Sequence, residues 1–324
     1  MTLSAAKYEV RADKRELAAM ASGYAAVFVA ALAIMFITFR AARIIGNHQP
    51  SIDAFSYVEA HLFILLVEII LWTIMVRAAI RFKSYTWRIR TSQDGSALNL
   101  IADAMLLSFA YAVLFDAAST VKTLFMGTPY LQAVTAVTNL LPLGVFLLLS
   151  VLLFTGSFRL SRLVPANPAF MHRHQRLIAL GLALFVLLVI PYSEYFYHVA
   201  PGILDDDGLQ RFILPQPALI AVYLMPFIAV WLLGLLSCLN LAKYAHLVPG
   251  KIYKPKFRNL YLGILISYIS TFLIQIFYVS NLPSNRFGLG LIFIISLIVM
   301  IIIGYSLMYR GANQLYMLEK SPTI

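Results

Sequence analysis

The sequence predicts an all-α integral membrane protein, a bundle of about eight transmembrane helices with both termini in the cytoplasm. Three observations support this prediction. The chain of 324 residues is 61% hydrophobic and only 12% charged, which is far from the composition of soluble domains. It contains apolar runs of about 20 residues, the length that crosses a bilayer. Its basic residues fall between alternate runs, which indicates a fixed orientation.

Each predicted helix is an apolar run long enough to span the membrane. The runs cover residues 18–39, 55–76, 98–121, 131–155, 177–199, 217–241, 259–280 and 287–309. The first run is too long for the apolar part of a signal peptide. Arg40 and Arg43 follow it where small residues would mark a cleavage site, so we interpret it as a retained anchor. We expect one transmembrane domain over 18–310, between a cytoplasmic segment 1–17 and a short tail 311–324.

The orientation follows from the basic residues. Of the 25 Lys and Arg, nearly all lie before the first run, after the last, or in every second connection; the exceptions are Arg40, Arg43, Lys122, Arg211 and Arg286. This asymmetry is the positive-inside pattern, and it requires an even number of spans if both termini are cytoplasmic. We expect the plasma (inner) membrane of a bacterium. The same basic clusters are suited to bind anionic lipid headgroups. Membrane topology explains the net charge of +11, so we expect no nucleic-acid partner.

Motifs of soluble enzyme classes are absent from the sequence. There is no zinc-finger spacing, Walker A loop, dinucleotide fingerprint, HExxH, GxSxG or kinase signature. Cys238 is the single cysteine, so no disulfide forms within the chain. Any binding or catalysis must therefore use the spans and their connections.

Polar residues within the apolar runs are the candidates for function, because such side chains are costly in lipid and usually face a bundle interior. Glu68, counted from Arg77 at about 1.5 Å per residue, falls near the bilayer midplane. The other candidates fall in the outer third of the membrane by the same count, and they are His61, Asp116, Glu194, His198, Gln275 and Tyr278. Asp103 lies near the cytoplasmic interface, and Ser96 is the expected N-cap of the run that contains it.

Helical spacing predicts which of these residues share a face. His61 and Glu68 nearly superimpose on one helix, and Ser267, Thr271, Gln275 and Tyr278 form one polar stripe on another. Pro142, Pro191 and Pro226 interrupt three further runs and are expected to bend them. We therefore predict an outward-facing polar pocket between runs 55–76, 98–121, 177–199 and 259–280. Its ligand-binding residues would be Glu68, Asp116, Glu194, Gln275 and Tyr278.

The stretch SEYFYH, residues 193–198, permits two interpretations. Glu194 and His198 are four residues apart, so on a helix they could both bind a divalent metal, with His61 as a further ligand. The alternative is a hydrogen-bonded pair in an aromatic belt at the membrane surface, formed with neighbouring tyrosines. A divalent metal is the one cofactor that the sequence suggests.

Three functions remain open at this point. The preferred one is a sensor-like or transport module that binds a small ligand or cation in the pocket and contacts a cytoplasmic partner through its C-terminal tail. The second is a membrane-embedded, metal-dependent hydrolase that uses His61, Asp116, Glu194 and His198. The third is a structural scaffold subunit without a ligand.

Overall fold

The computed structural model describes residues 3–48, 54–89, 92–125, 127–163, 174–187, 217–248, 251–280 and 287–320. These residues are almost all helical and include no strand. The helices are α1 (Leu3–His48), α2 (Ala54–Arg88), α3 (Gln93–Leu124), α4 (Leu131–Arg162), α6 (Pro217–Leu247), α7 (Lys254–Ser280) and α8 (Phe287–Lys320). A shorter apolar helix, His174–Leu187, lies between α4 and α6 in the chain.

The predicted all-α class is confirmed, and seven helices in the described part of the chain are long and apolar enough to cross a membrane. Seven of the eight predicted runs each lie within one of these helices, in the same order, and run 177–199 is described only to Leu187. The count of eight spans and the orientation of the termini stay predictions. Both predicted domain boundaries lie inside continuous helices, because α1 begins at Leu3 and α8 continues to Lys320.

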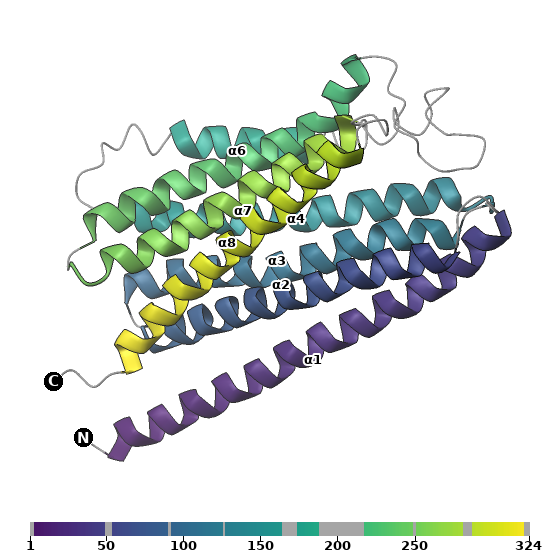
Figure 1. The fold of residues 1–324 in the computed structure, drawn as a ribbon. Helices are drawn as coiled ribbons and strands as arrows, with labels where there is room; N and C mark the ends of the chain where they lie inside the picture. Colours follow the sequence, from purple (N-terminus) through teal and green to yellow (C-terminus); the bar gives the residue numbers. More distant parts are fainter. Residues whose placement is uncertain are drawn as a thin grey trace.

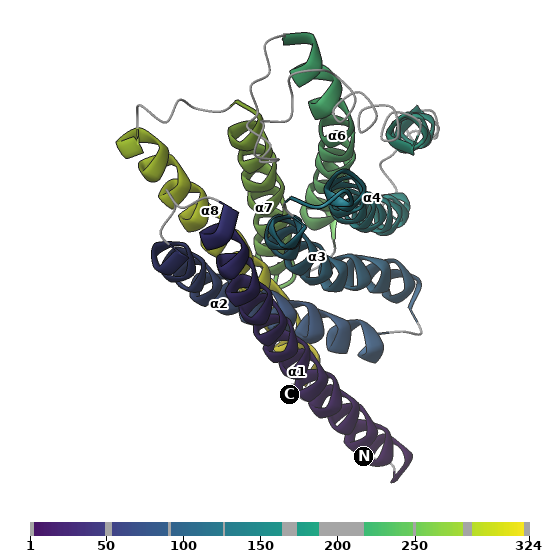
Figure 2. The ribbon, with the colours of Figure 1, turned by 90° about the vertical axis from the view of Figure 1, so that its right-hand side faces the viewer.

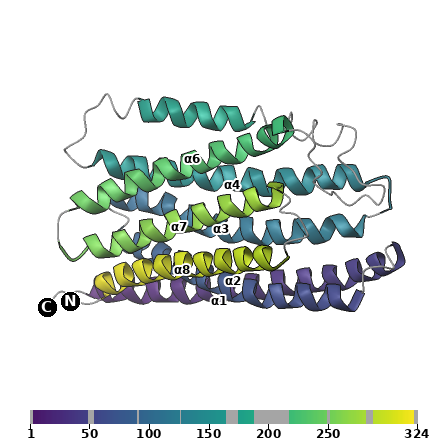
Figure 3. The same ribbon diagram turned by 45° about the horizontal axis from the view of Figure 1, so that its top comes forward.

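The helices run side by side along one direction, and the two termini lie at the same end of the bundle (Figures 1 and 3). We call this the terminal end and the opposite one the distal end. Helices α2 and α6 end, and α3 and α7 begin, at the terminal end, whereas α1, α3 and α7 end, and α2, α4 and α8 begin, at the distal end (Figures 1 and 3). Arg81, Lys83 and Arg88 all belong to the terminal end of α2, where the positive-inside pattern predicts cytoplasm.

Six of the helices form a closed ring. Neighbouring helices are in contact in the order α2, α3, α4, α6, α7 and α8, and α8 returns to α2. Helix α1 lies outside this ring and contacts only α2 and α3 among the described helices. Figure 2 views the bundle from the distal end and shows α1 in front of its neighbours. Phe28, Val29 and Phe36 of α1 are exposed, as expected of a helix that faces lipid.

Two glycines bring α7 and α8 into close contact. A Cβ atom on Gly263 would lie 2.5 Å from the carbonyl oxygen of Gly304, and a Cβ on Gly304 would lie 2.7 Å from Oγ of Ser267. Both distances are below normal contact, so only glycine fits. Membrane helices commonly associate through such small residues, because apolar side chains gain little by leaving apolar lipid.

Helix α3 begins earlier than the sequence predicts. The N-cap is Ser92, whose hydroxyl accepts a hydrogen bond of 3.0 Å from the backbone N–H of Gly95. The expected N-cap Ser96 lies inside the helix, so this prediction is wrong. The reason is that Asp94 and Gly95, which favour a turn in isolation, tolerate the first helical turn, where an acidic side chain stabilises the helix dipole. Asp94 also accepts a hydrogen bond of 3.1 Å from the Tyr244 hydroxyl.

Candidate functional site

The carboxyl groups of Glu68 on α2 and Asp116 on α3 lie close enough to interact with each other. Both residues are partly buried and lie well within helices that can span a membrane. An ionised carboxylate only accepts hydrogen bonds. Two neighbouring carboxyl groups can therefore form a hydrogen bond with each other only if one of them carries a proton.

The pair belongs to one antiparallel register along the α2–α3 hairpin. Tyr57 lies near Thr123 beyond it, toward the distal end. Lys83 pairs with Asp103 at the terminal end. The sequence predicts Glu68 near the bilayer midplane and Asp116 in the outer third, whereas in the structure the two residues lie side by side. That prediction counts Glu68 from Arg77, but α2 continues to Arg88, so the two carboxyls lie at the same level above the turn.

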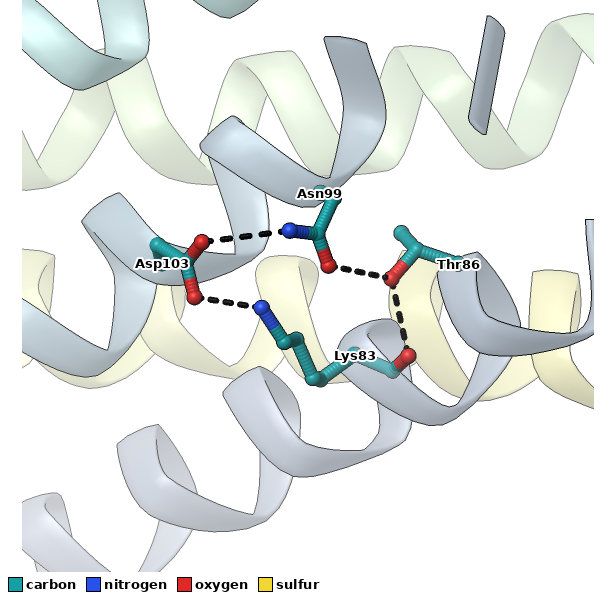
Figure 4. A network of polar contacts seen from close by, with 4 residues as sticks. All are labelled: Lys83, Thr86, Asn99 and Asp103. Carbon is teal, nitrogen blue, oxygen red and sulfur yellow. Dashed lines mark hydrogen bonds and ion pairs between the residues drawn. The ribbon is translucent and has the colours of Figure 1, made fainter. Parts of the chain in front are cut away.

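A second polar network lies on the same hairpin near the turn (Figure 4). Nζ of Lys83 donates to Oδ1 of Asp103 at 2.5 Å, and Nδ2 of Asn99 donates to the other carboxylate oxygen at 3.3 Å. The Thr86 hydroxyl lies 2.8 Å from the carbonyl oxygen of Lys83 and 3.3 Å from Oδ1 of Asn99. Asp103 thus has a cationic partner, and the network fixes the register that brings Glu68 to Asp116.

A small cavity lies inside the ring, between α3, α4, α7 and α8. Its volume is about 40 Å³, which is room for a few water molecules. The polar residues that line it are Ser108, Tyr111, Ser267, Tyr268, Thr271 and Tyr305. We call it the tyrosine cavity. Two of these residues, Ser267 and Thr271, belong to the polar stripe that the sequence predicts on this helix.

The hydroxyl groups of the tyrosine cavity present acceptors toward its interior. Ser108, Ser267 and Thr271 each donate to a carbonyl oxygen of their own helix, at 3.0, 2.9 and 2.9 Å. Their oxygen lone pairs therefore remain as acceptors. The Tyr268 hydroxyl bonds to Oγ of Ser150 at 2.7 Å, so a buried phenol is satisfied by α4. Acceptors of this kind suit a water molecule or a small cation.

Tyr305 on α8 connects the tyrosine cavity to the carboxyl pair. It lines the cavity together with Tyr111, and its phenol lies within electrostatic range of Asp116. Asp116 and the cavity residue Met105 are three helical turns apart on α3 and share a face. The carboxyl pair and the cavity are therefore parts of one polar region within the bundle.

The predicted metal ligands are placed only in part. His61 donates from Nδ1 to the carbonyl oxygen of Tyr57 at 2.9 Å, and its ring stacks on Tyr57 at 3.9 Å between centroids. Within the described ranges, no three His, Cys, Asp or Glu residues come together to hold a metal. Glu194 and His198 lie outside the described residues. Gln275 and Tyr278 lie in α7, but their side chains are outside the described part.

Sequence reasoning missed three of the tyrosines, namely Tyr111, Tyr268 and Tyr305. Each lies in the interior of a long apolar helix, and a buried phenol needs a hydrogen-bond partner. That requirement was the available signal. This signal is weak because tyrosines are also common at the membrane surface. Composition alone therefore does not distinguish a tyrosine inside the bundle from one in the aromatic belt at the membrane surface.

Comparison with known proteins gives no relative for this chain: no family model, no curated protein and no solved structure matches it.

Proposed function

We propose that this protein is a membrane module that binds a proton or another small cation at Glu68 and Asp116, and that it works as a sensor. The proximity of the two carboxyl groups inside the bundle is the observation that supports the proposal. Loss of the shared proton leaves two adjacent carboxylates that repel each other. A cation can then take the place of the proton, or the two side chains must separate, so occupancy is coupled to helix position.

Helix α8 supports the sensor over the transporter. Its Tyr305 interacts with Asp116, and the same helix continues without a break to the terminal end. There the guanidinium of Arg77 lies 5.2 Å from the ring of Tyr309. The guanidinium groups of Arg81 and Arg88 lie 4.5 and 5.3 Å from the ring of Tyr316. A movement of α8 at the carboxyl pair would therefore reach these contacts.

The basic residues of α2 are also joined to α1. Arg81 pairs with Glu16, which is buried, and Arg88 pairs with Asp13 at 2.9 Å. The terminal end thus contains one connected group of charged and aromatic side chains from α1, α2 and α8. This group is the output surface in the proposal, since it faces the side where the charge pattern predicts cytoplasm.

The test uses a fluorescent reporter on α8. Met317 is exposed and Cys238 is buried, so the Met317→Cys, Cys238→Ser protein can be labelled at one position with an environment-sensitive dye. After reconstitution into vesicles, we expect the fluorescence to change with pH or with added Na⁺. The Glu68→Gln, Asp116→Asn variant should lose this response.

Glu59→Gln is the matched control, because Glu59 is an exposed acid on the same helix. It should respond like the parent protein. A response that persists in the double variant rules out the carboxyl pair as the binding site. Uptake of protons into the vesicles that depends on Glu68, without a change at Met317, would establish the transporter instead.

A further inference from the structure

Two arginines converge on one aromatic ring at the terminal end of α4. The guanidinium carbon of Arg162 lies 4.7 Å from the centre of the Phe158 ring, and that of Arg176 lies 5.0 Å from it. Arg162 ends α4, whereas Arg176 belongs to the segment His174–Leu187. Phe158 and Ala179 belong to one hydrophobic cluster that joins the two helices, and both guanidinium groups lie beside the same ring.

This arrangement places two like charges close together, and they repel each other. Both side chains are exposed, and within the described chain neither forms an ion pair with a carboxylate. The third arginine of this end of α4, Arg159, is exposed as well and adds to the positive charge. An anion between the guanidinium groups would remove the repulsion, and their planar forks match the oxygens of a phosphate.

An apolar strip leads away from these arginines. Arg176, Leu180 and Leu184 follow each other at intervals of four residues, so they lie on one face of their helix. Leu180 is 57% exposed and Leu184 is 50% exposed. From Arg176 to Leu184 the strip extends about 12 Å along the helix. A charged group at one end and exposed leucines beyond it match a phospholipid with its headgroup at the membrane surface.

We propose that Arg162 and Arg176, stacked on Phe158, bind the phosphate of an anionic phospholipid whose acyl chain lies along Leu180 and Leu184. The site is separate from the carboxyl pair and does not depend on the function proposed for that pair. It is also more specific than a general attraction of basic loops to a charged membrane, because it names one ring, two guanidinium groups and one apolar strip.

The test measures lipid binding to the full chain in detergent by native mass spectrometry. Phosphatidylglycerol is the anionic probe, phosphatidylcholine the zwitterionic probe, and inorganic phosphate the free anion. We expect phosphatidylglycerol to bind with a stoichiometry of one. The Arg162→Gln, Arg176→Gln variant should bind it roughly tenfold to thirtyfold more weakly, from the usual effect of a basic residue at an anionic membrane surface.

Lys251→Gln, Lys254→Gln is the matched control, because it removes the same charge from an exposed turn at the same end of the bundle. It should bind within about twofold of the parent protein, as expected of distant surface charges. Equal losses in both double variants would show only a general charge effect and overturn the proposal. Inorganic phosphate that displaces the lipid at comparable concentration would make it a free-phosphate site and also overturn it.

A charge-conserving variant guards against a folding defect. Arg162→Lys, Arg176→Lys keeps both charges but loses the planar fork, so it should bind phosphatidylglycerol more weakly than the parent and more tightly than the glutamine variant. Far-ultraviolet circular dichroism should be the same for all variants. Binding by the lysine variant as weak as that of the glutamine variant would contradict a contribution from charge.

Discussion

The carboxyl groups of Glu68 and Asp116 lie close together across the α2–α3 hairpin, and a hydrogen bond between them requires that one of the two carries a proton. The contact between the two side chains therefore depends on their protonation. Every consequence for binding follows from the requirement that the two side chains share a proton, exchange it for a cation, or move apart.

The first prediction concerns the contribution of this bond to stability. Glu68→Gln keeps a donor for Asp116, so the free energy of unfolding should stay within about 1 kcal/mol of the parent value. Glu68→Leu leaves the Asp116 carboxyl without this partner and should cost about 1–3 kcal/mol. Unfolding by SDS in mixed micelles measures both. Equal stabilities for the two variants would mean that Asp116 finds another partner at no cost.

The second prediction concerns the close contact of α7 and α8. Gly304→Ala places a methyl group 2.7 Å from Oγ of Ser267, and the helices must separate to admit it. We expect a loss of about 1–3 kcal/mol in the free energy of unfolding, as for other overpacked sites. Gly144→Ala is the control, since a Cβ there has nothing within 4 Å. It should be neutral or stabilising by up to about 1 kcal/mol.

The third prediction concerns the network near the hairpin turn. Lys83 and Asp103 are partly exposed, with side-chain exposures of 16% and 37%, so their interaction is weaker than that of a fully buried pair. A double-mutant cycle with Lys83→Met and Asp103→Asn should give a coupling energy of about 1 kcal/mol. Additive effects of the two substitutions would show that the register of the hairpin does not depend on this ion pair.

The fourth prediction concerns the contact of α8 with the arginines of α2. Tyr316 is 1% exposed, and its ring lies near both Arg81 and Arg88. Tyr316→Leu should loosen the end of α8 and make it more rapidly cleaved by trypsin at Arg310. Tyr316→Phe retains the ring and so should be cleaved at nearly the parent rate. Rapid cleavage of the phenylalanine variant would assign the contact to the hydroxyl group instead.

The sequence alone predicts the helices well, because an apolar run of bilayer length has few other solutions in a membrane. It also identifies Glu68 and Asp116 individually, since an ionisable group in such a run stands out. It does not predict their pairing, because the level of a residue depends on where its helix ends, and Arg77 is not the end of α2. The sequence does not predict the place of Tyr305 either, because this depends on which helices α8 packs against.

The polar pocket predicted from the sequence and the tyrosine cavity share only some of their residues. Ser267 and Thr271 line the tyrosine cavity, as their shared stripe suggests, but the cavity is formed by α3, α4, α7 and α8 and not by the set of helices expected. Spacing along one helix predicts which residues share a face of that helix. Which helices contact each other depends on how they pack, and this cannot be predicted from one apolar run alone. Glu194 and His198 lie outside the described residues, so the metal hypothesis stays a prediction.

The closed ring has a consequence for the order of assembly during synthesis. Four of its six contacts join consecutive helices, and the contact of α4 with α6 passes over only the short helix His174–Leu187, so these five can form as the chain emerges. The contact of α2 with α8 joins the first and the last helix of the ring and must wait until α8 has been synthesised. Until then Arg77, Arg81 and Arg88 lack the aromatic rings that later lie beside them. The ring of helices is therefore open in the nascent protein, and it closes when Tyr309 and Tyr316 of α8 reach these arginines.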